Sequence, residues 1–205
     1  MLVNIWGTII HLSDSFFGGA FHTTKPSLDL LICERLNDRI TNHRGQTWMI
    51  NPVWHEPGTT AVLLRESYKT IMDFEECFIM LLTPGFADVV NEVPFELAGR
   101  YITQIAKRSQ VLNKRLVTTL IGIPPACPDN YCRKIEETNR VTEEISMEHE
   151  SVVVDLRSLS YSEWGVQGSK PTDLDVAADL ICEGILNSHA SIEVWQKMHD
   201  LYPSC

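Results

Sequence analysis

The chain has 205 residues, of which 44% are hydrophobic and 21% are charged, a balance typical of one globular domain with a full core. Its formal net charge of −10 argues against binding to a phosphate backbone or to an anionic membrane surface. The expected partner is therefore a small molecule or another protein, with no nucleic acid and no membrane involved.

Cysteine usage and the N-terminal segment favour a cytoplasmic location. The six cysteines are scattered, mostly within apolar segments, which is typical of buried reduced thiols. The first ten residues are apolar, but no Lys or Arg precedes Lys25 and no small-residue cleavage site follows them. Cys127 and Cys132 have neither a second matching pair nor a nearby histidine. We therefore expect no metal and no cofactor.

Hydrophobic patterning predicts five strands that alternate with helices. The first strand lies in the apolar run that stops at Ser13-Asp14-Ser15. Further strands are predicted at 46–53, 77–83, 115–123 and 151–156, and helices at 26–40, 61–72, 94–112, 130–147 and 173–186. Because parallel neighbours need long crossovers, this order predicts a three-layer α/β/α sandwich around a five-stranded parallel sheet. We expect one domain over residues 1–188 and a helical tail over 189–205 that packs on the domain or on a partner.

The turn after the first strand is a candidate ligand site. Open α/β folds bind their ligands at the carboxyl edge of the sheet, where this turn lies. There Ser15 places a hydroxyl next to the carboxylate of Asp14. The structural alternative is that Ser13 or Asp14 caps the following helix.

Three polar turns, one after each of the first three predicted strands, carry a recognisable pattern. They read Ser13-Asp14-Ser15-Phe16, Pro57-Gly58-Thr59-Thr60 and Gly85-Phe86-Ala87-Asp88. Over most of the chain this order resembles the SGNH/GDSL hydrolase family, which has a flavodoxin-like sheet and makes or breaks esters with a serine nucleophile. The resemblance implies that Ser15 is the nucleophile, that the backbone amides of Ser15 and Gly58 stabilise the oxyanion, and that the ligand is a small acyl or ester compound.

The remaining catalytic residues of the family are not matched. Where the family's third motif has an asparagine that completes the oxyanion hole, this chain has Ala87, which offers no side-chain donor. Gln167 and Lys170 stand at the family's acid and base positions, and no histidine occurs between residues 150 and 188. Losing one oxyanion donor costs on the order of a hundredfold to a thousandfold in turnover. Losing the histidine also removes the usual base.

Two replacements for the missing base stay open. Lys170 is one, as in Ser-Lys hydrolases, provided that desolvation keeps its amine neutral. The other is His11 or His55, each predicted at the carboxyl end of a strand, with Asp14, Glu56 or Asp88 orienting the ring. The candidate catalytic residues are therefore Ser15, Asp14, His55 and Lys170, and the candidate oxyanion or ligand-binding residues are Gly58, Gly85, Asp88 and His11.

Several of these residues have ordinary structural interpretations. His55 is then a turn histidine held by local hydrogen bonds, and Lys170 is an exposed loop lysine. Asp88 either caps the helix that begins near Pro94 or bonds to the Ser15 turn. Phe86 and Trp164 either line a pocket or cover the edge of the sheet.

Two functions follow from these observations. The first is an acyl-ester hydrolase or acyltransferase with a non-standard catalytic set centred on Ser15. The second is an inactive subunit of the same fold that binds a ligand or supports a partner enzyme, as a homodimer or with another protein. An apolar stripe within residues 192–202 fits the second function. A flavin or nucleotide binder would need a phosphate-cradling turn where Asp14 stands, and is disfavoured.

Overall fold

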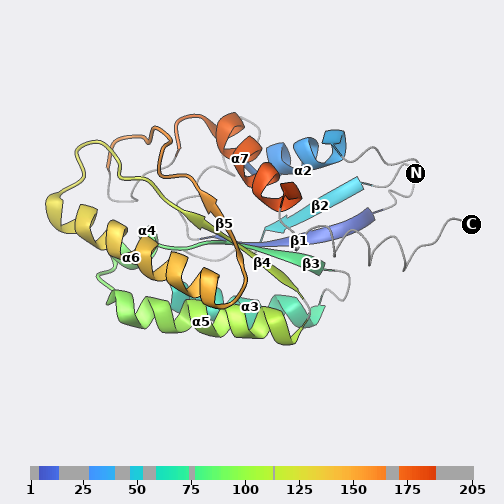
Figure 1. Ribbon diagram of the computed structural model, residues 1–205, viewed down its shortest axis with the longest axis horizontal. Coiled ribbons are helices and arrows are strands. Elements are labelled where there is room, and N and C mark those ends of the chain that lie inside the picture. The colour runs from blue at the N-terminus through green and yellow to red at the C-terminus, as the bar shows by residue number, and fades with distance from the viewer. Residues whose placement is uncertain are drawn as a thin grey trace, which may run out of the picture.

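In the part of the chain that the structure describes, a parallel sheet of five strands organises the fold (Figure 1). The computed structural model describes residues 5–13, 28–39, 47–52, 59–73, 77–112, 114–164 and 171–187. The strands are β1 (Ile5–Ser13), β2 (Thr47–Pro52), β3 (Cys77–Thr83), β4 (Arg115–Leu120) and β5 (Val152–Asp155). Their order is β2-β1-β3-β4-β5 and every neighbouring pair is parallel. This is the flavodoxin-like order, and it confirms the predicted fold class.

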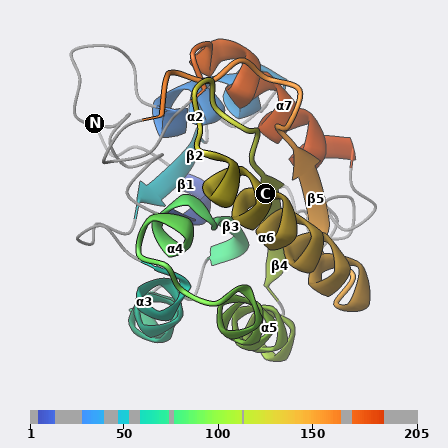
Figure 2. The ribbon, with the colours of Figure 1, turned by 90° about the vertical axis from the view of Figure 1, so that its left-hand side faces the viewer.

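Helices cover both faces of the sheet (Figure 2). They are α2 (Leu28–Arg39), α3 (Thr60–Asp73), α4 (Phe86–Val90), α5 (Phe95–Val111), α6 (Asp129–Glu148) and α7 (Leu174–Asn187). Helices α2 and α7 pack together on one face, and α3, α5 and α6 lie on the other. Figure 2 views the molecule from the edge at which the strands end, and α4 lies at this edge.

The central strands are apolar on both sides because both faces of the sheet are covered. Successive side chains of β1 enter opposite cores, with Ile9 packed on the α2 and α7 side and Ile10 on the α3 and α5 side. In β3, Leu81 and Leu82 divide in the same way. These four side chains are fully buried, so the register of β1 against β3 is fixed by two cores at once.

Two details differ from the sequence prediction. β4 ends at Leu120 rather than at residue 123, because the backbone N–H and C=O of Ile121 bond to the side chain of Asn139. The turn after β3 contains the short helix α4, which the sequence analysis treated as part of a loop. Gly85 precedes α4 with φ +127°, a conformation that favours glycine, and an added Cβ would lie 3.1 Å from Ile121.

Within the ranges that the structure describes, no helix is both long and apolar enough to cross a membrane. The predicted tail over residues 189–205 lies outside the described residues.

Candidate active site

The carboxyl edge of the sheet brings together the ends of β1 and β3 and the start of α3. Ser13, the last residue of β1, is the register partner of Thr83, the last residue of β3. Of the predicted site residues, His11, Gly85 and Asp88 lie at this edge within described segments. Ser15, Asp14, His55, Gly58 and Lys170 lie outside the described residues, so their assigned roles stay predictions.

Asp88 in α4 links the turn after β3 to the first residue of α3. Its Oδ1 accepts hydrogen bonds from the backbone N–H of Thr60 at 3.1 Å and from the Thr60 hydroxyl at 3.0 Å. Oδ2 also lies 3.2 Å from the Thr60 nitrogen. The first N–H groups of a helix lack partners within the helix, and the Asp88 carboxylate supplies one for the N–H of Thr60, the first residue of α3. The expectation that Asp88 caps the helix beginning near Pro94 is wrong: Pro94 precedes α5 without a side-chain cap.

The Asp88 carboxyl is held in a largely dry environment. Only 1% of the residue is exposed. Burial raises the pKa of Asp88 from its usual 3.8 to about 6, although the bonds from Thr60 act in the opposite direction. Asp88 therefore changes charge near neutral pH while it holds two segments of the site edge together.

His11 of β1 lies in a buried chain of polar contacts between α2 and β3. Its Nδ1 is 2.6 Å from Oδ1 of Asp29 in the first turn of α2, and its Nε2 is 3.2 Å from Oγ1 of Thr83. All three residues are almost fully buried. Among the described residues, the carboxylate that contacts the His11 ring is therefore Asp29; Asp14 and Glu56, which the sequence suggested for this role, lie outside the described residues.

The turn after β3 has backbone groups but no amide side chain in the place where the family has asparagine. Ala87 is 2% exposed and its side chain is a methyl group. Beside it, Phe86 is fully buried and makes ring contacts with Tyr161 at 6.1 Å and Trp164 at 6.2 Å between centroids. Phe86 thus anchors the turn as part of the core, and of the two predicted interpretations the structure supports the one in which it covers the edge of the sheet.

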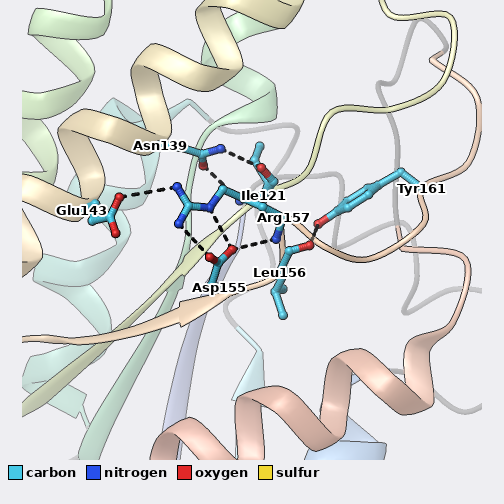
Figure 3. A network of polar contacts seen from close by, with 7 residues as sticks. All are labelled: Ile121, Asn139, Glu143, Asp155, Leu156, Arg157 and Tyr161. Atoms are coloured by element: carbon cyan, nitrogen blue, oxygen red, sulfur yellow. Dashed lines mark hydrogen bonds and ion pairs between the residues drawn. The ribbon is translucent and has the colours of Figure 1, made fainter.

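The loops after β4 and β5 are fixed by a separate network (Figure 3). The Asn139 side chain accepts from Ile121 N at 3.0 Å and donates to Ile121 O at 2.6 Å. The Tyr161 hydroxyl donates to Leu156 O at 3.2 Å, and burial raises the pKa of this phenol to about 12, so it stays protonated.

Asp155, the last residue of β5, forms an ion pair with Arg157 in the same network (Figure 3). Its two carboxylate oxygens accept from Arg157 Nε at 2.9 Å and from Arg157 Nη2 at 2.7 Å. These bonds lower the pKa of Asp155. This carboxylate is therefore an ionised partner of Arg157, and not a general acid.

The cysteine pair after β4 is a local structural contact. The Cys132 thiol donates to the backbone carbonyl of Cys127 at 3.2 Å, and burial raises the pKa of Cys127 to about 12. A metal ligand must be a thiolate, which this environment disfavours. In the described part of the chain no group of three His, Cys, Asp or Glu side chains is placed to hold a metal ion.

Three polar residues at this edge were missed as site candidates by the sequence analysis: Asp29, Thr83 and Thr60. A signal for Asp29 existed, because it falls three and seven residues before Ile32 and Leu36 on the buried stripe of α2. A carboxylate on an apolar stripe calls for a buried partner. Thr83 and Thr60 carry no comparable local signal.

Neither a protein-family model nor a curated protein matches this sequence. Solved structures do match in fold. A lipase/acylhydrolase from Enterococcus faecalis superposes with a TM-score of 0.69 at 14% identity, over 88% of this chain and 96% of that one. The esterase EstA from Pseudoalteromonas sp., in a form inhibited by monoethylphosphonate, gives 0.62 at 17% identity over 93% and 99%. AlinE4, an SGNH-hydrolase family esterase, gives 0.59 at 15% identity over 75% and 77%. The chain therefore has the fold of the SGNH hydrolases.

Proposed function

We propose that the protein is an acyl-ester hydrolase or acyltransferase that works through Ser15 with a catalytic set different from the usual triad. The ligand is a small acyl ester or thioester. In the first step the Ser15 hydroxyl gives its proton to a base and attacks the carbonyl carbon, and the backbone amides of Ser15 and Gly58 stabilise the oxyanion. The alcohol or thiol of the substrate then leaves with that proton, and an acyl ester remains on Ser15. Water completes a hydrolysis, and a second hydroxyl or amine completes a transfer.

The observation that supports this proposal is that the end of β1, the turn after β3 and the start of α3 lie at one edge of the sheet. β1 ends at Ser13, one residue before Asp14, in register with the end of β3. Asp88, in the turn after β3, binds Thr60, two residues after Gly58. Such an edge is where open α/β sheets place their ligands. The neighbouring esterase structures with the same fold support the reaction class by analogy.

We also propose a cytoplasmic location. The six cysteines are scattered along the chain, mostly within apolar segments, as is usual for buried thiols in a reducing compartment.

Ser15→Ala is expected to lower the turnover of reactive aryl esters and thioesters at least a hundredfold, because the attacking hydroxyl is removed. The measurement is kcat/KM against a panel of p-nitrophenyl esters and acyl thioesters of increasing chain length. Ser13→Ala is the matched control, since it changes a serine only two residues away in sequence, at the end of β1, and it should keep most of the activity. Equal turnover in wild type and Ser15→Ala would remove Ser15 from the mechanism.

A second function is favoured by two departures from the family pattern. Ala87 supplies no side-chain oxyanion donor, and the segment that bears the family histidine contains none in this chain. An inactive subunit that binds a ligand or a partner enzyme would have these features. It predicts no turnover above that of the Ser15→Ala protein on any substrate of the panel, together with co-purification of a partner or self-association in size-exclusion chromatography.

A further inference from the structure

Cys127 and Cys132 occupy two positions at the start of α6 whose side chains meet. Cys132 lies in the first turns of the helix, and Cys127 directly precedes the N-cap residue, Pro128. These are the two positions whose side chains pack on each other in a hydrophobic staple. The Cys132 thiol lies 3.2 Å from the backbone carbonyl of Cys127, and the two thiols also interact with each other. The fold therefore brings both sulfur atoms together.

Backbone hydrogen bonds hold the pair in place on both sides. Ala126 has a φ of +56°, a left-handed conformation that makes a tight turn immediately before Cys127. The N–H of Cys127 bonds to Pro124 O at 3.3 Å. The N–H of Cys132 bonds to Pro128 O at 3.0 Å. A disulfide forms without strain only between cysteines whose side chains already face each other, so closing a bond here requires little movement of the backbone.

The pair is accessible to a small reagent. Both cysteines are partly exposed, whereas Cys182 in α7 is fully buried. They lie at the carboxyl edge of the sheet, where α6 begins (Figure 2). Next to them, Tyr131 stacks on Trp164 with 5.2 Å between the ring centroids. A bond between the cysteines would therefore close the first turn of α6 beside the aromatic contact that joins this helix to the loop after β5.

The environment of Cys127 decides which sulfur reacts first. Partial burial, the contact with Cys132 and the charge of Asp129 raise the pKa of Cys127 to about 12. Cys127 therefore keeps its proton in the reduced pair. An exchange reaction, which needs a thiolate as the attacking group, then begins at the Cys132 sulfur.

We propose that Cys127 and Cys132 form a reversible disulfide by exchange with a low-molecular-weight disulfide such as oxidised glutathione. The Cys132 thiolate attacks one sulfur of the reagent, and the first glutathione leaves. Cys127 Sγ then attacks the Cys132 sulfur of the mixed disulfide and releases the second glutathione. The two thiol protons of the pair end on the two glutathiones, so two cysteines are oxidised and one reagent disulfide is reduced. Disulfides in a reducing compartment are transient, and excess reduced glutathione reverses this one.

The test equilibrates the 205-residue chain in buffers of reduced and oxidised glutathione. The remaining thiols are blocked with N-ethylmaleimide, and a tryptic digest is examined by mass spectrometry. Both cysteines fall in one peptide, residues 116–133, because no Lys or Arg lies between Arg115 and Arg133. As the buffer becomes more oxidising, this peptide should lose both maleimide labels and two hydrogens. Dithiothreitol should restore them.

Three comparisons separate a preformed pair from two independent thiols. Cys33→Ser and Cys182→Ser leave the pair intact and should give the wild-type result. Cys127→Ser should stop at a single glutathione adduct on Cys132. In the folded wild type the equilibrium constant for the disulfide should exceed that in urea by about tenfold or more. Closing the loop costs the unfolded chain entropy that the folded chain has already lost.

Four results would overturn the proposal. They are a peptide that keeps both labels in every buffer, a peptide in which each cysteine carries its own glutathione, a disulfide from either residue to another cysteine, and an equilibrium no more favourable than in urea. The disulfide does not depend on the catalytic role proposed for Ser15, and its detection requires no turnover. A failure of one proposal therefore leaves the other standing.

Discussion

Replacing Phe86 with alanine is expected to lower the free energy of unfolding by about 3–5 kcal/mol, the usual cost of deleting a buried aromatic ring. Phe86 is fully buried and its ring contacts both Tyr161 and Trp164, so the cavity would open where α4 meets the loop after β5. Activity per folded molecule should also fall, because Phe86 anchors the turn after β3, and this turn carries Asp88. Urea unfolding monitored by circular dichroism measures the first effect.

Phe95→Ala is the matched control for this prediction. Phe95 begins α5 and is only partly buried, so its loss should cost clearly less than the loss of Phe86. Phe86→Leu should recover much of the stability, since it refills most of the volume. Equal costs for Phe86→Ala and Phe95→Ala would contradict the anchoring role of Phe86.

Asp88→Asn is expected to remove a pH-dependent contribution of roughly 3 kcal/mol to the free energy of unfolding. This is the free energy that corresponds to a pKa of about 6 for Asp88 in the folded protein against the usual 3.8. The folded protein binds this proton more tightly than the unfolded chain does. The stabilisation is therefore fully present below about pH 3.8 and is lost as the pH rises through about 6. Asparagine keeps an acceptor for Thr60 without the buried charge, so the wild type should lose stability relative to Asp88→Asn as the pH rises from about 3.5 to about 7.5.

Asp155→Asn supplies a control of opposite sign. The ion pair with Arg157 lowers the pKa of Asp155, so its stabilisation is present above the unfolded pKa and is lost as the pH falls. The stability of wild type relative to Asp155→Asn should therefore rise with pH, whereas that of wild type relative to Asp88→Asn falls. A stability difference between wild type and Asp88→Asn that does not vary with pH would contradict the desolvation of Asp88.

The sequence predicted those parts of the fold whose patterns are local and long. The run 77–83 is apolar up to its last residue, Thr83, and lies between Glu76 and Pro84, and β3 has these bounds. The helix predicted at 94–112 has several turns of apolar periodicity, and α5 occupies residues 95–111. Helix α4 has only five residues, too few to show a helical period, and so it was read as a loop.

The polar contacts of the site were not predictable in the same way. His11 was a candidate, but its partners lie 18 and 72 residues away in sequence. Asp88 was placed at the correct edge, but its bond to Thr60 spans 28 residues. Such pairs are set by the tertiary arrangement of α2, β1, β3 and α3, and no local pattern encodes which carboxylate meets which donor.

Identifying the residue that reacts with an ester-like phosphonate tests the central claim most directly. The protein is treated with a fluorophosphonate, digested, and the modified peptide is sequenced by mass spectrometry. We expect a single phosphonyl adduct on Ser15, formed in wild type and in Ser13→Ala and absent from Ser15→Ala. An adduct on another residue, or no adduct in a protein that hydrolyses esters, would contradict a mechanism centred on Ser15.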